Sequence, residues 1–347
     1  MIDFTEATLN RIALHNVGNK TNEESLALSS EPLELRDAFL KDVLIRYFTA
    51  PFKSPSFFNF QIAGDDNEVY NAVSEVFQSP GKLFDASVKM ATLLYDRSEH
   101  PKIKAGEFYM VYFENIVVDE ETVNAVGLFK SENKDTYLKV FPKNENFELA
   151  CDMGININKL DKGCIVFNSE KEEGYRLCIV DAVSGGGEEA RYWKDAFLNV
   201  KYREDKFHHT SNFMKLCADF CEEVLTEDNQ VAKRDQVMIK NRTADYFKNN
   251  DKFNVEDFTK EVMEVPEVIE SFNEYKQNFF KKGDIQPFEE FEISPEAVKQ
   301  TKKMFRNILK LDKNFHVYIH GNHDCIQKGF DPEKNMNYYQ LFFNQEL

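Results

Sequence analysis

The stretch from Cys151 to Cys221 constrains the fold of this chain more than any other part. It holds two apolar runs rich in β-forming residues, 164–167 and 175–180, separated by a polar segment that ends at Gly174. Runs of this kind joined by a short glycine-containing segment predict an antiparallel hairpin. A glycine triplet, the only tryptophan, a basic segment and a helical pattern follow. We therefore expect a strand pair, a glycine hinge and a basic helical region in succession.

The residues before this stretch indicate helices beside a mostly antiparallel sheet. Alternation of apolar and polar residues predicts strands, and apolar residues three and four apart predict helices. The expected strands are 10–17, 108–113, 122–129 and 137–141. The expected helices run from Ser29 or Ser30 to Tyr47, over 69–77 and over 83–95. Helices and antiparallel strands in this arrangement are typical of an α+β fold.

Beyond Val200 the pattern becomes mainly helical. Helices are expected over 213–224, 231–247, 255–263 and 266–280, and from Ser294 to about Leu311. Ser294 is suited to cap the last of these, because Pro295 and Glu296 follow it in the first turn. Short closing strands are expected at 315–319 and 338–343. We predict an α+β domain over residues 1–200 and a mainly helical region over 201–347, with no low-complexity linker between them.

Composition favours a globular protein without a membrane anchor. Hydrophobic residues make up 42% of the 347 positions, and charged residues make up 30%. No apolar run approaches the roughly 18 residues that cross a bilayer, and the first residues do not resemble a signal peptide. The six cysteines are scattered, which is typical of reduced thiols in the cytosol.

The net charge of −17 argues against indiscriminate attraction to polyanions. Residues 191–248 are nearly balanced, with 11 basic and 10 acidic side chains, and the other segments are acidic. Two basic stretches remain as candidate contacts to DNA phosphates. Contacts of this kind do not depend on the base sequence of the DNA. The first comprises Arg191, Lys194, Lys201, Arg203 and Lys206, and the second comprises Lys299, Lys302, Lys303, Arg306, Lys310 and Lys313. The alternative for each stretch is a solvated helix face.

Three motifs raise other possibilities. Gly321-Asn322-His323-Asp324 is similar to a metallophosphoesterase motif, but the further carboxylates and histidines that would hold two metal ions are missing. Cys217 and Cys221, with His208 and His209 upstream, have a spacing that zinc tolerates, but the apolar neighbours favour buried thiols. Gly185-Gly186-Gly187 lacks the lysine and hydroxyl residue of a nucleotide loop. We expect the Gly321–Asp324 segment to form a turn, the two cysteines to be free thiols and the glycine triplet to be a hinge. We expect no metal, no cofactor and no catalytic residue.

The order of several short motifs resembles the bacterial nucleoid-associated proteins of the NdpA/YejK type. The similarity lies in Asp152 to Gly163, in the hairpin, in Arg191-Tyr192 and Phe197-Leu198 through to Phe220, and in the opening Ile12-Ala13-Leu14-His15. This resemblance implies a cytoplasmic protein of the nucleoid that binds double-stranded DNA with little sequence preference. It supplies no catalytic residues.

The leading hypothesis is thus a non-enzymatic, nucleoid-associated DNA-binding protein. This hypothesis leaves open whether the chain also binds a protein partner at the nucleoid. The first alternative is an adaptor whose acidic surface binds a DNA-processing partner. The second is a metal-dependent phosphoesterase that uses His323 and Asp324.

Overall fold

The computed structural model of the protein describes residues 2–52, 56–62, 67–182, 192–226, 229, 231, 233–283, 287–305, 308–311, 315–318 and 326–345. The chain forms two compact units, Met1–Arg203 and Glu204–Leu347. The sequence boundary near residue 200, read as a border between independently folding domains, stays a prediction. Mixed helices and antiparallel sheets confirm the α+β class.

The first unit is built on a nine-stranded sheet with the order β11-β4-β10-β9-β6-β5-β2-β3, in which β1 also pairs with β5. All the pairings are antiparallel. The strands are β1 Ile2–Asp3, β2 Thr8–Val17, β3 Leu26–Ala27, β4 Phe57–Phe60, β5 Gly106–Val118, β6 Glu121–Ser131, β9 Lys162–Phe167, β10 Arg176–Asp181 and β11 Val200–Tyr202.

The hairpin predicted from sequence is β9 and β10, paired from Lys162 with Asp181 to Phe167 with Arg176. Gly174, before β10, has φ +94°, a conformation in which glycine is favoured. Its carbonyl accepts a hydrogen bond from Phe60 N at 2.9 Å, so this turn also fixes β4 beside β10.

Helices cover both faces of the sheet. On one face lie α2 Glu68–Gln78, α3 Leu83–Asp96 and a π-helical turn at Tyr192–Leu198, with Trp193 fully buried. On the other face α1 Ala38–Thr49 places Phe48 against Phe129, with ring centroids 4.3 Å apart. Successive β5 residues enter opposite cores, because side chains alternate along a strand.

The first helix begins later than the sequence predicted. Asp37 caps it by accepting from Phe39 N at 2.8 Å, so the expected start at Ser29 or Ser30 is wrong. The residues before it are held to β2 instead, because Ser29 N donates to His15 Nδ1 at 3.1 Å and β3 pairs with Val17. Contacts with residues distant in sequence thus override the helical spacing.

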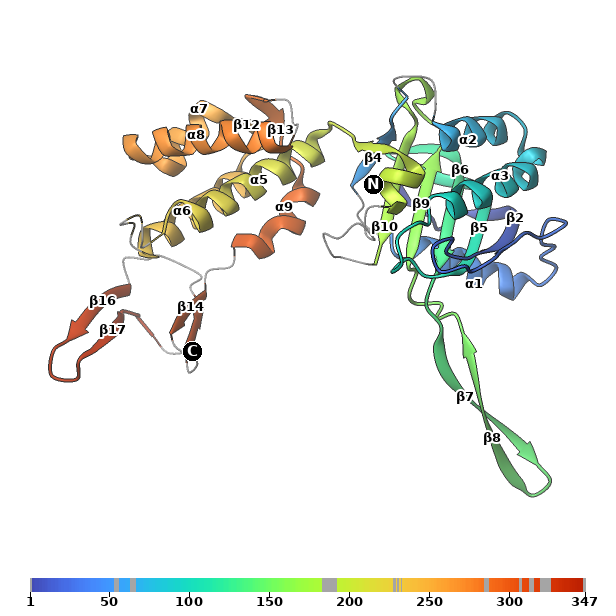
Figure 1. Ribbon diagram of the computed structural model, residues 1–347. Helices are drawn as coiled ribbons and strands as arrows, with labels where there is room; N and C mark the ends of the chain where they lie inside the picture. The colour runs from blue at the N-terminus through green and yellow to red at the C-terminus, as the bar shows by residue number, and fades with distance from the viewer. Residues whose placement is uncertain are drawn as a thin grey trace. The chain divides into compact units, whose positions relative to one another are not determined.

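Strands β7 Asp135–Lys143 and β8 Asn146–Gly154 form a separate two-stranded ribbon inserted between β6 and β9. The ribbon extends away from the nine-stranded sheet (Figure 1). We call it the β7–β8 arm. Tyr137–Phe141 was predicted as a strand, but the partner strand was not, although Phe147, Leu149, Cys151 and Met153 alternate with other residues in the sequence.

The second unit is mainly helical around an aromatic core. Its centre is Phe213, whose ring lies 4.2 Å from that of Phe253 and 5.3 Å from that of Phe258. The elements are α5 Lys206–Glu223, α6 Lys233–Asn249, β12 Lys252–Asn254, α7 Val255–Phe258, a π-helical turn η5 Thr259–Met263, α8 Pro266–Gly283, β13 Glu290–Glu292 and α9 Pro295–Thr301. Strand β12 pairs with β13.

The helix after Ser294 is shorter than predicted. Ser294 Oγ accepts from Ala297 N at 3.3 Å, as expected of a cap, but α9 ends at Thr301 and a 3-10 turn, η6 Lys302–Phe305, follows. The expected continuation to Leu311 is wrong, since β14 Ile308–Leu311 pairs with β15 Phe315–Tyr318. The branched and aromatic residues of these segments favour strand pairing.

A second hairpin, β16 Ile326–Asp331 and β17 Met336–Leu341, completes the described part of the chain. Each closing strand expected from sequence therefore pairs within its own hairpin. Among the described residues, the longest helices are too polar to cross a membrane.

Candidate nucleic-acid interface

Lys194 lies on the π-helical turn of the first unit, and its amine lies over the faces of two aromatic rings. The Nζ atom is 3.8 Å from the centroid of the Tyr202 ring and 4.7 Å from that of Phe58. Cations in this position are attracted to the negative face of the ring. Burial lowers the pKa of the Lys194 amine, opposed by the charge of Asp195. Lys194 thus has an internal role in joining β4 to β11.

Arg203 is engaged in an ion pair. Its Nη1 atom bonds Glu170, its Nη2 atom is 3.1 Å from Glu170 Oε1, and Glu173 lies at 4.0 Å. A guanidinium that binds both oxygens of a carboxylate makes one of the stronger surface pairs. Contact between Arg203 and a phosphate would therefore have to compete with Glu170.

The two remaining described cations of the first stretch are more accessible. Lys201 is exposed on β11, which is the edge strand of the sheet. Lys206, at the start of α5, belongs to the second unit, where its amine is 3.9 Å from Glu292 and both side chains are more than half exposed. A pair this exposed contributes little, so Lys206 remains available to an anion.

The second stretch places three exposed lysines beside the core of the second unit. Ala297 and Phe305 are buried, which turns the intervening Lys299, Lys302 and Lys303 outward. None of these three amines forms an ion pair with another residue of the described ranges. They are the least compensated group of the predicted cations that the structure describes.

Lys206 lies near the beginning of α9. The pKa of Glu296, in the first turn of α9, is lowered by hydrogen bonds from its own backbone N–H and from Ser294 Oγ, and to a smaller extent by Lys206. Lys206 is therefore grouped with the second stretch by the fold of the second unit. The first stretch predicted from sequence is divided: its described members Lys194, Lys201 and Arg203 belong to the first unit.

Several predicted residues lie outside the described part of the chain. These are Arg191, Arg306 and Lys313, the side chain of Lys310, the Gly185-Gly186-Gly187 segment and the Gly321-Asn322-His323-Asp324 segment. Lys310 stands on β14 rather than on a helix, so the six cations of the second stretch do not share one helix face.

The zinc alternative finds no support in the described residues. Cys217 and Cys221 are buried in the aromatic core, and burial raises the pKa of the Cys217 thiol. His209 packs on the ring of Phe288 at 4.5 Å, and His208 bonds the Asn212 side chain at 2.7 Å. No three histidine, cysteine or acidic side chains within the described ranges are grouped as a metal site would require.

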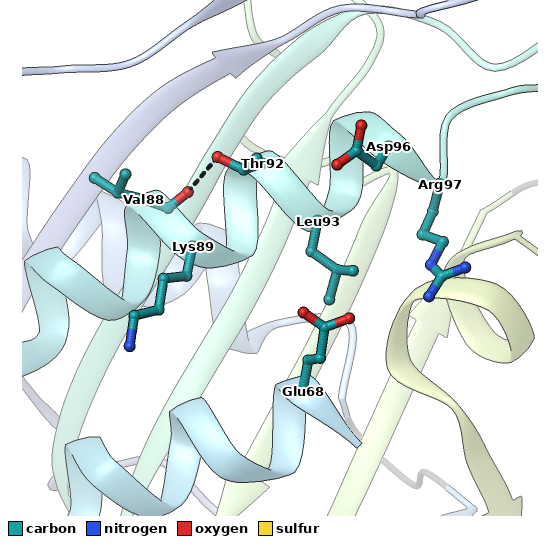
Figure 2. A pocket seen from close by; sticks show the side chains of 7 residues that line it. All are labelled: Glu68, Val88, Lys89, Thr92, Leu93, Asp96 and Arg97. Atoms are coloured by element: carbon teal, nitrogen blue, oxygen red, sulfur yellow. Dashed lines mark hydrogen bonds between the residues drawn. The ribbon is translucent and has the colours of Figure 1, made fainter. Parts of the chain in front are cut away.

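A shallow hollow of about 450 Å³ lies between α2 and α3. Figure 2 shows Glu68 of α2 facing Leu93 of α3, with Thr92 Oγ1 bonded to the Val88 carbonyl at 2.9 Å. Two of its charged side chains already have partners, since Lys89 is 3.8 Å from Glu75 and Asp96 is 3.0 Å from Lys20. The residues that line this hollow on the helix surface do not form the convergent group of nucleophile, base and oxyanion donors that a catalytic site requires.

A buried polar cluster at the ends of β6 and β9 was not foreseen from sequence. Lys130 and Lys162 are opposite each other in the strand register, and both are buried. The Lys130 amine lies 3.1 Å from Glu132 and donates to the Lys104 carbonyl at 2.7 Å, while Lys162 lies 2.6 Å from Asp181. Tyr192 OH donates to Glu132 at 2.6 Å. The sequence signal is a lysine near the end of one apolar strand pattern, Lys130, and another just before the next, Lys162.

The comparison with protein families decides the relationship suggested by the short motifs. The family model of the nucleoid-associated protein YejK matches residues 13–337. The chain belongs to the nucleoid-associated protein YejK family. This match spans both units and confirms the family expected from sequence. A search of curated proteins gave no match to this chain.

Proposed function

We propose that this member of the YejK family binds double-stranded DNA with little sequence preference and acts without catalysing a reaction, in the nucleoid of a bacterial cytoplasm. The match to the family over residues 13–337 carries the proposal. The exposed amines of Lys299, Lys302 and Lys303, which form no ion pair with another described residue, support it, since contacts to DNA phosphates come largely from such side chains.

The proposed contacts are electrostatic. Each lysine would approach a phosphate as a point charge and release condensed counterions, a process that is independent of base sequence. Lys206, Arg306, Lys310 and Lys313 of the second unit would add to the group, and Lys201 and Arg191 would be phosphate contacts of the first unit. With a net charge of −17 for the whole chain, the acidic remainder repels DNA. Binding should therefore be weak at physiological salt and steep in its salt dependence.

Lys194 and Arg203 take a secondary place in this proposal. The amine of Lys194 would have to leave two aromatic rings, and Arg203 would have to leave Glu170. The loss of either existing contact would offset part of the binding free energy that a phosphate contact contributes. Substitution of either residue should change stability more than DNA affinity.

The test is a titration of the full chain with duplexes of unrelated sequence at several salt concentrations. The variant carries Lys299→Glu, Lys302→Glu and Lys303→Glu. If each lysine contacts one phosphate, the log–log salt slope should lose roughly 0.9 per lysine, about 2.7 in all, equally for every duplex. The matched control carries Lys82→Glu, Lys171→Glu and Lys248→Glu, which are exposed positions with the same change of charge.

An equal effect of both variants would show a general charge effect and would contradict the assigned interface. Undetectable DNA binding by the wild-type chain at low salt would contradict the function itself. That second result would favour the adaptor hypothesis, for which the acidity of the chain is the supporting observation.

A further inference from the structure

The β7–β8 arm has two chemically different faces. Residues opposite each other in a strand pair project to the same side of the ribbon. One side carries the pairs Thr136 with Met153, Leu138 with Cys151, Val140 with Leu149, and Pro142 with Phe147. This apolar face holds no charged side chain. The other side, the polar face, carries the pairs Tyr137 with Asp152, Lys139 with Ala150, Phe141 with Glu148, and Lys143 with Asn146.

The charges of the polar face are compensated within the arm. Lys139 lies 2.6 Å from Asp152, and its amine is 5.5 Å from the centroid of the Tyr137 ring. Lys143 forms an ion pair with Glu148. These pairs suit a solvated surface and leave no surplus positive charge for a polyanion. The arm is therefore not a DNA-binding element of the lysine-rich kind.

The apolar face is exposed to an unusual degree. Phe147 is 74% exposed and Leu149 is 70% exposed, and Leu138, Val140 and Met153 are each more than 60% exposed. A two-stranded ribbon by itself is at best marginally stable in water, and an apolar patch this continuous marks an interaction surface. The described residues of the first unit supply no cover, because the two strands pack on each other and extend away from the sheet (Figure 1).

The base of the arm is firmly attached. Asp161, immediately before β9, accepts hydrogen bonds from Glu132 N at 2.6 Å and from Asn133 N at 3.0 Å. Asp135, the first residue of the arm, is held by Asn156 at 2.7 Å and Lys159 at 3.2 Å. Both sides of the base are thus fixed before any partner binds, which lowers the entropic cost of docking.

We propose that the apolar face of the arm is a self-association surface that packs against the same face of a second copy of this chain. An uncharged apolar ribbon is best covered by another of the same length, and two β layers pack face to face at about 10 Å. A second copy supplies that ribbon, and the two-fold symmetric pairing buries the same patch on both chains. The compensated polar faces then remain in water on both outer sides.

The size of the face sets the strength of the pairing. A buried side chain of the Val, Leu, Phe or Met class removes roughly 60–120 Å² of apolar surface from water. Five such residues at about two-thirds exposure, on two arms, give roughly 400–800 Å², to which Thr136, Pro142 and Cys151 add. Interfaces near or below about 1,200 Å² belong to weak and transient complexes. The dimer should therefore form and dissociate at micromolar concentrations.

Sedimentation velocity of the full chain from about 1 to about 200 µM, the range of weak association, measures this directly. We expect a concentration-dependent shift from monomer to dimer. Leu149→Lys places a charge in the interface and should weaken dimerisation at least about tenfold. The matched control, Phe141→Lys, adds the same charge to the polar face opposite Glu148 and should leave the dimer within about threefold of wild type.

Cross-linking locates the interface independently. Cys151 is on the apolar face and is the exposed member among the described cysteines. In a Cys325→Ser background, a short bismaleimide should join two chains through Cys151 at high protein concentration, and Phe141→Lys should not prevent it. Replacement of residues 136–153 by a short Gly-Ser loop should leave a folded monomer, which circular dichroism verifies.

Two results would overturn the proposal. One is a wild-type chain that stays monomeric throughout the concentration range, which would assign the face to a different partner. The other is a dimer that survives both Leu149→Lys and removal of the arm. Neither result bears on DNA binding by Lys299, Lys302 and Lys303, so this inference and the proposed function fail separately.

Discussion

Nε2 of His15 lies 2.8 Å from Oγ of Ser87, within the core between β2 and α3. Ser87 Oγ already donates its proton to the Phe84 carbonyl at 2.7 Å, so it accepts from the imidazole. The other ring nitrogen, Nδ1, accepts from Ser29 N at 3.1 Å. These partners assign a neutral ring with its proton on Nε2, and a second proton would displace Ser29.

This arrangement predicts a loss of stability in mild acid. Burial lowers the pKa of His15 below its ordinary value of 6.5. Between the two values the unfolded chain binds the proton and the folded chain does not. The free energy of unfolding should therefore fall as the pH drops from 6.5 to the lowered pKa, and this loss should level off below it. Chemical denaturation at a series of pH values measures the effect.

His15→Gln should remove this contribution while lowering stability at neutral pH by about 1–3 kcal/mol, through the disturbed hydrogen bonds. His100→Gln, at a partly buried loop position, is the control and should retain the wild-type pH dependence. Identical pH profiles for wild type and His15→Gln would refute the role of His15.

The buried pair of Lys130 and Glu132 predicts a non-additive response. Lys130→Met leaves the Glu132 carboxylate without its cation and the Lys104 carbonyl without its donor, which should cost about 3–5 kcal/mol. Adding Glu132→Gln removes the buried carboxylate charge that has lost its cation, and should restore at least about 1 kcal/mol of the free energy of unfolding. Urea unfolding of the two single variants and the double variant gives the coupling. Strict additivity would show that the two side chains act independently.

Gly174→Ala tests the turn before β10. A Cβ atom at this position would overlap the Phe60 carbonyl oxygen, and φ is +94°. The combined backbone strain and overlap should destabilise the chain by about 2–4 kcal/mol. Gly81→Ala is the matched control, because a Cβ atom there meets no other atom within 4 Å, and its effect should stay within about 0.5 kcal/mol. Equal melting temperatures for both variants would contradict the structure of the turn.

The cysteines should differ sharply in reactivity. Cys151 is exposed, whereas Cys164, Cys178, Cys217 and Cys221 are buried, and burial raises the pKa of Cys164, Cys178 and Cys217. In a Cys325→Ser background at submicromolar protein, a maleimide should label Cys151 rapidly and the other four only on unfolding. Fast labelling that survives Cys151→Ser would contradict this assignment. In the unmodified chain, denaturation without reductant should reveal all six thiols.

Local signals in the sequence were sufficient for many elements. The β9–β10 hairpin was predicted because two apolar runs flank a polar turn that ends at Gly174, and α2 and α3 were predicted because their buried residues recur at helical spacing. The cap at Ser294 was equally visible. These features depend on residues close together in the chain, whose preferences tertiary contacts reinforce.

The same local reasoning failed where distant residues compete. The segment after Ser29 binds to β2, and Ile308–Leu311 pairs with β15, so neither continues a helix. The contacts of the two cations also depend on distant residues. Lys194 lies against the rings of Tyr202 and Phe58, and Arg203 pairs with Glu170.

The sequence by itself determined the α+β class, the family and the presence of two basic stretches, because composition, periodicity and motif order express them directly. Only the tertiary structure decided the strand order, which lysines lack an ion pair among the described residues, and that the β7–β8 arm presents an exposed apolar face. Alternation along β7 and β8 indicates two faces, but it does not tell whether the apolar one meets a core. Burial and charge compensation are properties of residues brought together from distant positions, so they emerge only when the chain is folded.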